Sequence, residues 1–232
     1  MKIEIWSDIM CPFCYIGKRR FEQALETFNG KDKVEIEWKS YLLSPEMVTD
    51  PTKNMHQFLA EHKGVSLEEA TGMNDYVTNM AAETGLTYNF DKAIPANSFN
   101  AHRMLHFAKE FGLQNEAEEA LFKAYFTDGK NIDDAATLSE IAASVGLNTT
   151  ELAEAMGSEA YFQDVVMDVQ EAQNIGVRGV PFFVFNRKYG VSGAQDAATF
   201  LEVLEKSYGE WQQASAPLDI IEGDSCGVDG KC

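Results

Sequence analysis

The sequence predicts an α/β fold in which a small strand-and-helix domain is interrupted by a large all-helical insertion. Three observations support this: a strand–helix–strand pattern at the start of the chain, a long stretch with only helical patterns, and strand character that returns near residue 180. We assign 1–45 and 171–210 to the α/β domain and 46–170 to the insertion. Residues 211–232 then form a C-terminal tail that contains cysteines.

The N-terminal segment has the pattern of a βαβ unit. Apolar and charged residues alternate over 1–8 and again over 33–41, which predicts two strands. Between them, apolar residues at helical spacing predict a helix over 12–28, with Gly30 as a stop signal. A strand, helix and strand in so short a segment predict that the two strands are parallel.

The middle of the chain, from about 50 to 175, is helical in pattern and divides into five to seven segments. Ser66 and Glu69 have the spacing of a capping box at the start of one of these helices. Apolar stripes at helical spacing predict two more helices near 101–108 and 138–145. This block carries no chemical motif of its own.

The last part of the predicted domain returns to strands. Residues 180–185 form an unbroken apolar run, typical of a strand that is buried on both faces. A turn over 186–188 and a partner strand over 189–192 follow, and a final helix is predicted over 196–207.

Composition and charge exclude several classes of function. The chain has 232 residues, 45% of them hydrophobic, and a formal net charge of −18, so a nucleic acid or an anionic membrane surface would repel it. No segment approaches the roughly 18 apolar residues of a membrane helix. The N-terminus lacks the apolar run of a secretory signal, and we therefore expect a cytoplasmic protein.

The four cysteines lie at the two ends of the chain, at positions 11, 14, 226 and 232. In a reducing compartment, paired cysteines at short spacing indicate redox chemistry or metal binding. A zinc site needs a second ligand pair of suitable spacing, so we expect no metal at Cys11 and Cys14. His102 and His106 could form a metal pair on one helix, but no third ligand is evident, and we expect surface or partly packed side chains.

Cys11 and Cys14 have the spacing of a redox pair at the start of a helix. Cys11 lies in the N-cap region, with Pro12 as the first helical residue. Free N–H groups and the helix dipole there favour a thiolate at Cys11. Cys14 lies one turn further on the same face, close enough to form a disulfide. We expect Cys11 to attack a substrate disulfide and Cys14 to resolve the mixed disulfide.

Several motifs together resemble the DsbA-related oxidoreductases of the FrnE type. The matching segments are Trp6-Ser-Asp8, Cys11-Pro-Phe-Cys14-Tyr-Ile-Gly-Lys18, Gly179-Val-Pro181 and Val191-Ser-Gly-Ala-Gln195. The resemblance covers nearly all of 1–207 and implies a thioredoxin-like fold of the DsbA type, interrupted by a helical insertion. It also implies that Cys11 is the nucleophile, Cys14 the resolving thiol and Pro181 a cis-proline that faces Cys11.

The resemblance and the local sequence together suggest where substrates bind. By similarity, the backbone before Pro181, at Val180, pairs with a substrate chain. Met10 and Phe13 lie beside the active thiol and are predicted to offer an apolar surface to unfolded chains, with ordinary packing in the core as the equal alternative. Phe13 is a departure, because periplasmic DsbA proteins have His there, and the resemblance therefore does not imply a strongly oxidising pair.

The predicted function is a thiol–disulfide oxidoreductase or isomerase that acts on protein or peptide substrates through Cys11 and Cys14. We expect no cofactor, with glutathione or a dithiol reductant as candidate electron donor, and the oligomeric state stays open. The alternatives are a glutathione-dependent isomerase or transferase of the kappa-class-like branch, and a redox-switched holdase. Kappa-class-like members usually have Ser where Cys11 stands, so two cysteines favour dithiol exchange.

The tail cysteines allow a second redox pair. Cys226 and Cys232 enclose a loop with Gly227 and Gly230, which is flexible enough for a disulfide. Closing so short a loop gains little stability, so a purely structural bridge is the weaker interpretation. We predict a disulfide-forming pair that can exchange electrons with Cys11–Cys14, against the alternative of a reduced, solvated tail.

Overall fold

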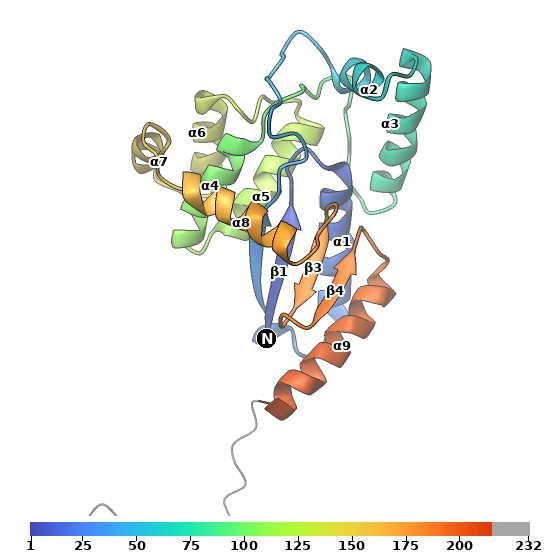
Figure 1. Ribbon diagram of the computed structural model, residues 1–232, viewed down its shortest axis with the longest axis vertical. Helices are drawn as coiled ribbons and strands as arrows, with labels where there is room; N and C mark the ends of the chain where they lie inside the picture. The colour runs from blue at the N-terminus through green and yellow to red at the C-terminus, as the bar shows by residue number, and fades with distance from the viewer. Residues whose placement is uncertain (215–232) are drawn as a thin grey trace, which may run out of the picture.

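The computed structural model describes residues 1–214 (Figure 1). The elements follow in the order β1 (Lys2–Ser7), α1 (Pro12–Thr27), a 3-10 turn (Lys31–Lys33), β2 (Glu35–Ser40), α2 (Met55–Lys63), α3 (Leu67–Ala82), α4 (Phe99–Glu110), α5 (Gln114–Phe122), a π-helical turn (Lys123–Thr127), α6 (Ala135–Ser144), α7 (Thr149–Met156), α8 (Phe162–Asn174), β3 (Phe182–Phe185), β4 (Tyr189–Ser192) and α9 (Ala197–Ala214). Helices α2 to α8 all fall between 55 and 174, which confirms the helical pattern predicted for this stretch.

The four strands form one mixed sheet in the order β2-β1-β3-β4. β1 and β2 are parallel, as the βαβ pattern predicts, with Ile3 opposite Ile36 and Ile5 opposite Trp38. β3 runs antiparallel to both β1 and β4. This confirms the α/β class and the thioredoxin-like arrangement that the resemblance implies.

The two faces of the sheet are covered by different helices. Ile3, Ile5 and Phe183 are buried in a core with residues of α1 and α9, which lie side by side on one face (Figure 1). Trp6 and Val184 each follow one of these residues in the strand and point to the other face. There they pack with Ala172 of α8 and with Val177 just after it. The period of two in the strands therefore assigns successive side chains to two separate cores.

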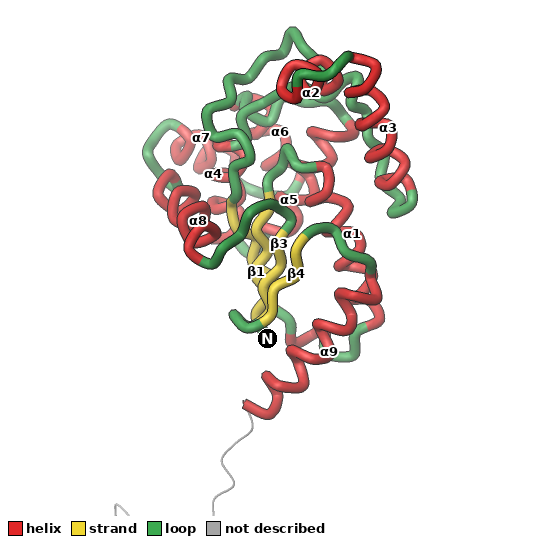
Figure 2. The backbone as a smooth tube through the Cα atoms, turned by 45° about the vertical axis from the view of Figure 1, so that its right-hand side comes forward, coloured by secondary structure: helices red, strands yellow, loops and turns green. Residues whose placement is uncertain are grey.

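The insertion shares its main core with α1. Helices α2 and α3 lie beyond the end of the sheet at which β1 and β2 finish (Figures 1 and 2). The largest hydrophobic cluster contains Cys14, Tyr15 and Ile16 of α1 together with buried residues of the insertion. Within it, the rings of Tyr15 and Phe122 stack at 4.8 Å between centroids. The start of α1 is thus enclosed by the inserted helices.

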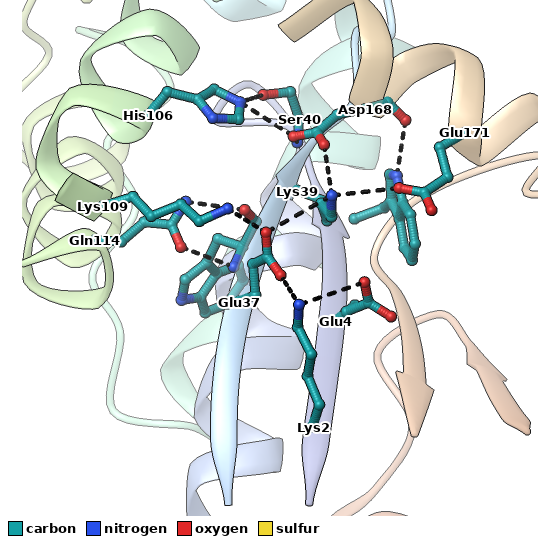
Figure 3. Close-up of polar contacts among 12 residues, drawn as sticks. Lys2, Glu4, Glu37, Lys39, Ser40, His106, Lys109, Gln114, Asp168 and Glu171 are labelled. Atoms are coloured by element: carbon teal, nitrogen blue, oxygen red, sulfur yellow. Dashed lines mark hydrogen bonds and ion pairs between the residues drawn. The ribbon is translucent and has the colours of Figure 1, made fainter. Parts of the chain in front are cut away.

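Polar contacts also join the insertion to β2, which is one of the two edge strands of the sheet (Figure 3). The Gln114 side chain accepts a hydrogen bond from the N–H of Trp38 and donates one to its carbonyl, at 3.0 and 2.9 Å. Asp168 of α8 accepts from the backbone N–H of Ser40 at 2.9 Å and pairs with Lys39 at 2.8 Å. These side chains satisfy backbone groups that an exposed sheet edge would leave free.

Two predicted boundaries differ from the structure. β3 begins at Phe182, because Pro181 has no N–H to donate to a strand ladder. The final helix was predicted to end at 207, which is wrong, since α9 continues to Ala214, the last described residue. Tyr208 explains the extension, because it packs edge-on against Phe28 at 5.2 Å and keeps this part of the helix on the core.

Of the helices within 1–214, none is long and apolar enough to cross a membrane.

Candidate active site

Cys11 is the N-cap residue of α1, as predicted. Its backbone is extended, with φ −85° and ψ 111°, and Pro12 follows as a first-turn residue. The Cys11 N–H donates to the carbonyl of Asp8 at 2.9 Å, so a tight turn connects the end of β1 to the helix. The Cys11 sulfur therefore lies at the positive end of the helix dipole.

Cys14 occupies a different environment although it lies in the same helical turn. Its N–H donates to the Cys11 carbonyl at 3.0 Å, and both thiols are free. Cys14 is fully buried, whereas Cys11 keeps 4% of its surface exposed. Burial raises the pKa of the Cys14 thiol well above its ordinary value, and the hydrogen bond and charge of Cys11 add to this rise.

The Val180–Pro181 peptide bond is cis and lies beside Cys11, which confirms the prediction. The Cys11 Sγ is 3.4 Å from the Val180 carbonyl oxygen. Gly17 of α1 permits the close packing of this loop, because a Cβ atom at that position would lie 2.9 Å from Cγ of Pro181. The loop before β3 is thus held against the first turns of α1.

A cavity of about 840 Å³ opens at Cys11. Its walls come from the start of α1, from helices α2 and α3, and from the loop at 179–180. The walls are mostly apolar, and their charged residues are Lys63 and Glu69. A second cavity, of about 440 Å³, lies around 44–62 and contains no cysteine. The larger cavity is therefore the one that a substrate of Cys11 would enter.

The structure brings some of the predicted contact residues together. Phe13 and Val180 line the large cavity with Cys11. Met10 is buried in the main core and does not line it, so Met10 is not placed to contact a substrate. Pro181 packs behind Val180 against α1 and is not part of the wall either.

Sequence reasoning missed the contribution of α3 to the cavity. Met73, Tyr76 and Val77 line it, and the first two are exposed apolar side chains at 42% and 65%. Their spacing of three and four residues is the signal that could have identified them as one helix face. Only the fold shows that this helix face lies in the same cavity as Cys11.

Buried polar residues next to Cys14 were also missed. The Ser7 hydroxyl donates to the Glu118 carboxylate of α5 at 2.8 Å, and both side chains are buried. Desolvation raises the pKa of Glu118 to about 7, although His102, Ser7 and Lys18 oppose the rise. A strong pKa shift beside a redox pair marks a group of functional interest.

The expectation that His102 and His106 are surface or partly packed side chains is wrong. Both are buried, because each meets acidic partners inside the fold. The Nε2 of His102 lies 3.7 Å from Asp8, and that of His106 lies 3.1 Å from Asp168. Within residues 1–214, no group of three His, Cys, Asp or Glu side chains is placed to hold a metal ion.

The predicted second pair, Cys226 and Cys232, lies outside the described residues.

Comparison with known proteins places most of the chain, insertion included, in one family. A family model described as a DSBA-like thioredoxin domain matches residues 2–205. The uncharacterized protein YwbO of Bacillus subtilis (strain 168) is 30% identical over 191 residues, which cover 78% of this chain and 85% of that protein.

Solved structures extend the comparison. The crystal structure of a probable DsbA oxidoreductase from Streptomyces coelicolor is 38% identical and has a TM-score of 0.86, with 99% of this chain and 97% of the other covered. The cytosolic disulfide reductase DsbM of Pseudomonas aeruginosa, solved with GSH, is 15% identical and has a TM-score of 0.64. The match covers 90% of this chain and 100% of the DsbM chain. At that identity the likeness shows a shared fold.

Proposed function

Because this chain belongs to the family of DSBA-like thioredoxin domains, we propose that it exchanges disulfides with protein substrates through Cys11 and Cys14. One observation carries this proposal: the Cys11 sulfur sits at a helix N-terminus, faces the Val180 carbonyl, and opens into a large apolar cavity. Nucleophile, backbone acceptor and substrate space thus meet at a single point.

The chemistry follows from the two environments. The Cys11 thiolate attacks one sulfur of a substrate disulfide, a Cys11–substrate bond forms, and the other substrate sulfur leaves as a thiolate. Cys14 then attacks the Cys11 sulfur, which closes the Cys11–Cys14 disulfide and releases the substrate in reduced form. The reverse sequence oxidises a substrate dithiol. An extended substrate backbone beside Cys11 would find the Val180 carbonyl as a hydrogen-bond acceptor.

The cavity wall favours an apolar polypeptide over glutathione. Phe13, Leu43 and Tyr76 present exposed apolar surface there, and such surface binds apolar side chains by excluding water. Glutathione carries two carboxylates, while Lys63 is the single cation of the wall. Glutathione remains the second candidate substrate, because a relative of the same fold was solved with GSH.

The same pair would act as an isomerase if a substrate thiol displaced Cys11 before Cys14 reacted. We place this activity in the cytoplasm, with glutathione or a dithiol reductant returning the pair to its reduced form. Cys226 and Cys232 remain a proposed second pair that exchanges electrons with the first.

Turnover of a protein disulfide tests the proposal. With a reductant present, the wild-type protein should reduce insulin disulfides many times per chain, and Cys11→Ser should abolish this. Cys14→Ser should instead accumulate a mixed disulfide with substrate at Cys11, detectable by non-reducing electrophoresis. A redox-switched holdase would react once per chain and stop. Faster turnover of oxidised glutathione than of insulin would contradict a preference for protein substrates and favour the glutathione-dependent alternative.

A further inference from the structure

One position on the wall of the large cavity has no side chain. Gly72 lies in the interior of α3 and lines the cavity that opens at Cys11. Outside the backbone of α3 and the adjacent residues, no atom of the described chain lies within 4 Å of the position that its Cβ would take. A side chain at this position would therefore extend into the open space of the cavity.

The local structure of α3 gives no reason for a glycine at position 72. A glycine inside a helix lowers stability relative to alanine, because its unfolded chain has more backbone freedom to lose. Gly72 does not have a positive φ, so any residue could adopt its backbone conformation. Gly17 of α1 is different, since Pro181 occupies the space that its side chain would need. What the missing side chain of Gly72 leaves open is part of the cavity.

The surface around Gly72 is apolar. Met73 and Tyr76 flank it on the cavity side of α3, and both side chains are exposed. Glu69, one turn earlier, uses its carboxylate to accept hydrogen bonds from the backbone N–H and the hydroxyl of Ser66, at 2.9 and 2.8 Å. That carboxylate is therefore committed to the start of the helix. The gap at Gly72 between Met73 and Tyr76 is here called the Gly72 notch.

The Gly72 notch and the reactive sulfur share one space. Cys11, Val180 and Gly72 line the same cavity, of about 840 Å³. Sites for drug-sized ligands measure roughly 300–1,000 Å³, so this cavity has room for a short segment of polypeptide. Helix α3 is tied to α2 by a hydrogen bond between the Asn74 amide and the His56 ring at 3.0 Å. A substrate whose cysteine reaches Cys11 therefore brings its neighbouring side chains to a preformed notch.

We propose that Gly72 is a specificity-determining residue, whose missing side chain makes room for a large apolar side chain next to the substrate cysteine that Cys11 attacks. Such a side chain packs between Met73 and Tyr76 against the backbone of α3 and excludes water from that surface. A substrate with a small residue at the same place leaves the notch to water. This inference rests on the proposed function and names the class of polypeptide that the site selects.

Short peptide disulfides test this selection. Each peptide carries one cysteine bonded to an aromatic thiol that is coloured when released, and the residue directly before or directly after the cysteine is Phe or Ala. When the reduced full-length protein attacks, a bond forms between the Cys11 sulfur and the peptide sulfur, and the aromatic thiolate leaves with the bonding electron pair. The Phe/Ala ratio of the second-order rate constants measures selection and cancels any change in the reactivity of Cys11.

We expect the wild-type protein to react about 10-fold faster with the Phe peptide than with the Ala peptide in at least one of the two positions. Gly72→Leu should bring this ratio close to 1, because its side chain occupies the notch, and Gly72→Ala should give an intermediate ratio. Alanine and leucine are both strong helix formers, so a change in helix stability alone would affect the two variants alike.

Gly209→Leu is the matched control, because Gly209 is another helical glycine with open space at its Cβ position, but it lies on α9 and does not line the cavity. It should keep the wild-type ratio. Circular dichroism checks the fold of each variant, and Gly72→Ala keeps the test valid if Gly72→Leu does not fold.

Two results would contradict the role of Gly72: a Phe/Ala ratio near 1 in the wild-type protein, or a wild-type ratio in the folded Gly72 variants. A failure of the proposed function would look different. In that case the wild-type protein would release thiolate from every peptide no faster than Cys11→Ser does.

Discussion

At the scale of single residues, Cys11 and Cys14 differ through their surroundings more than through their position in the chain. Cys11 meets the helix N-terminus, the Val180 carbonyl and the cavity. Cys14 meets a dry core and the Ser7–Glu118 pair. The outer thiol is therefore suited to attack substrates, and the inner thiol is shielded from solvent.

The buried acid should lower stability in a pH-dependent way. Since desolvation raises the pKa of Glu118 from 4.5 to about 7, the folded protein holds a proton that the unfolded chain releases. The cost is absent below pH 4.5, grows between the two values and is complete above pH 7, where it amounts to on the order of 3 kcal/mol.

We therefore expect Glu118→Gln to raise the free energy of unfolding above pH 7 by up to that amount, and to match the wild type near pH 4.5. Urea unfolding over this pH range measures the difference, with Glu116→Gln expected to follow the wild type. Parallel stability curves for Glu118→Gln and wild type would show that Glu118 titrates normally in the fold.

At the scale of elements, the site depends on how closely α1 approaches the loop before β3. The absence of a side chain at Gly17 lets Pro181 pack against the helix, and this places Val180 beside Cys11. Gly209 of α9 is also helical, but among the described residues nothing lies within 4 Å of the position its Cβ would take. A side chain at Gly17 would therefore clash with Pro181, whereas a side chain at Gly209 would change only the helix propensity.

Gly17→Ala should lower the free energy of unfolding by about 1–3 kcal/mol, because the new methyl group overpacks the Pro181 contact. It should also slow disulfide exchange by moving Val180 relative to Cys11. Gly209→Ala should instead be neutral or stabilise the protein by roughly 0.5–1 kcal/mol, with unchanged exchange. Urea unfolding and insulin reduction measure both effects, and equal behaviour of the two variants would contradict this account of Gly17.

At the scale of the whole molecule, the inserted helices and the α/β framework share one core. The main hydrophobic cluster includes Ile9, Tyr15 and Ile16 at the start of α1 as well as residues of the insertion. Gln114 and Asp168 add hydrogen bonds from the insertion to the backbone of β2. Unfolding of the insertion would therefore expose α1 and free the edge strand.

We expect a single cooperative unfolding transition. Trp6 and Trp38 contact the insertion through Asp168 and Asn115, whereas Trp211 lies on α9, so the fluorescence of a variant that keeps only Trp211 reports on the α/β framework. Far-ultraviolet circular dichroism reports mainly on the helices of the insertion. The two signals should give the same urea midpoint, since two-state unfolding requires coincident transitions. Separate midpoints would show that the insertion unfolds independently.

The sequence by itself determined the local elements and the reactive pair. Alternation predicted β1 and β2, Ser66 and Glu69 predicted the capping box at the start of α3, and Cys11 with Pro12 predicted the start of α1. These signals depend on residues within one or two turns of each other, where periodicity and capping act. Local patterns therefore sufficed for them.

Only the tertiary structure decided what surrounds that pair. Ser7 and Glu118 are 111 positions apart, and Met73 and Tyr76 reach the cavity from a helix with no catalytic motif of its own. His102, expected nearer the surface, is buried because the packing of α4 faces it toward Asp8 and Glu118. Such contacts arise when the inserted helices bury their apolar faces against α1, and a periodic pattern shows which face is buried without showing what it is buried against.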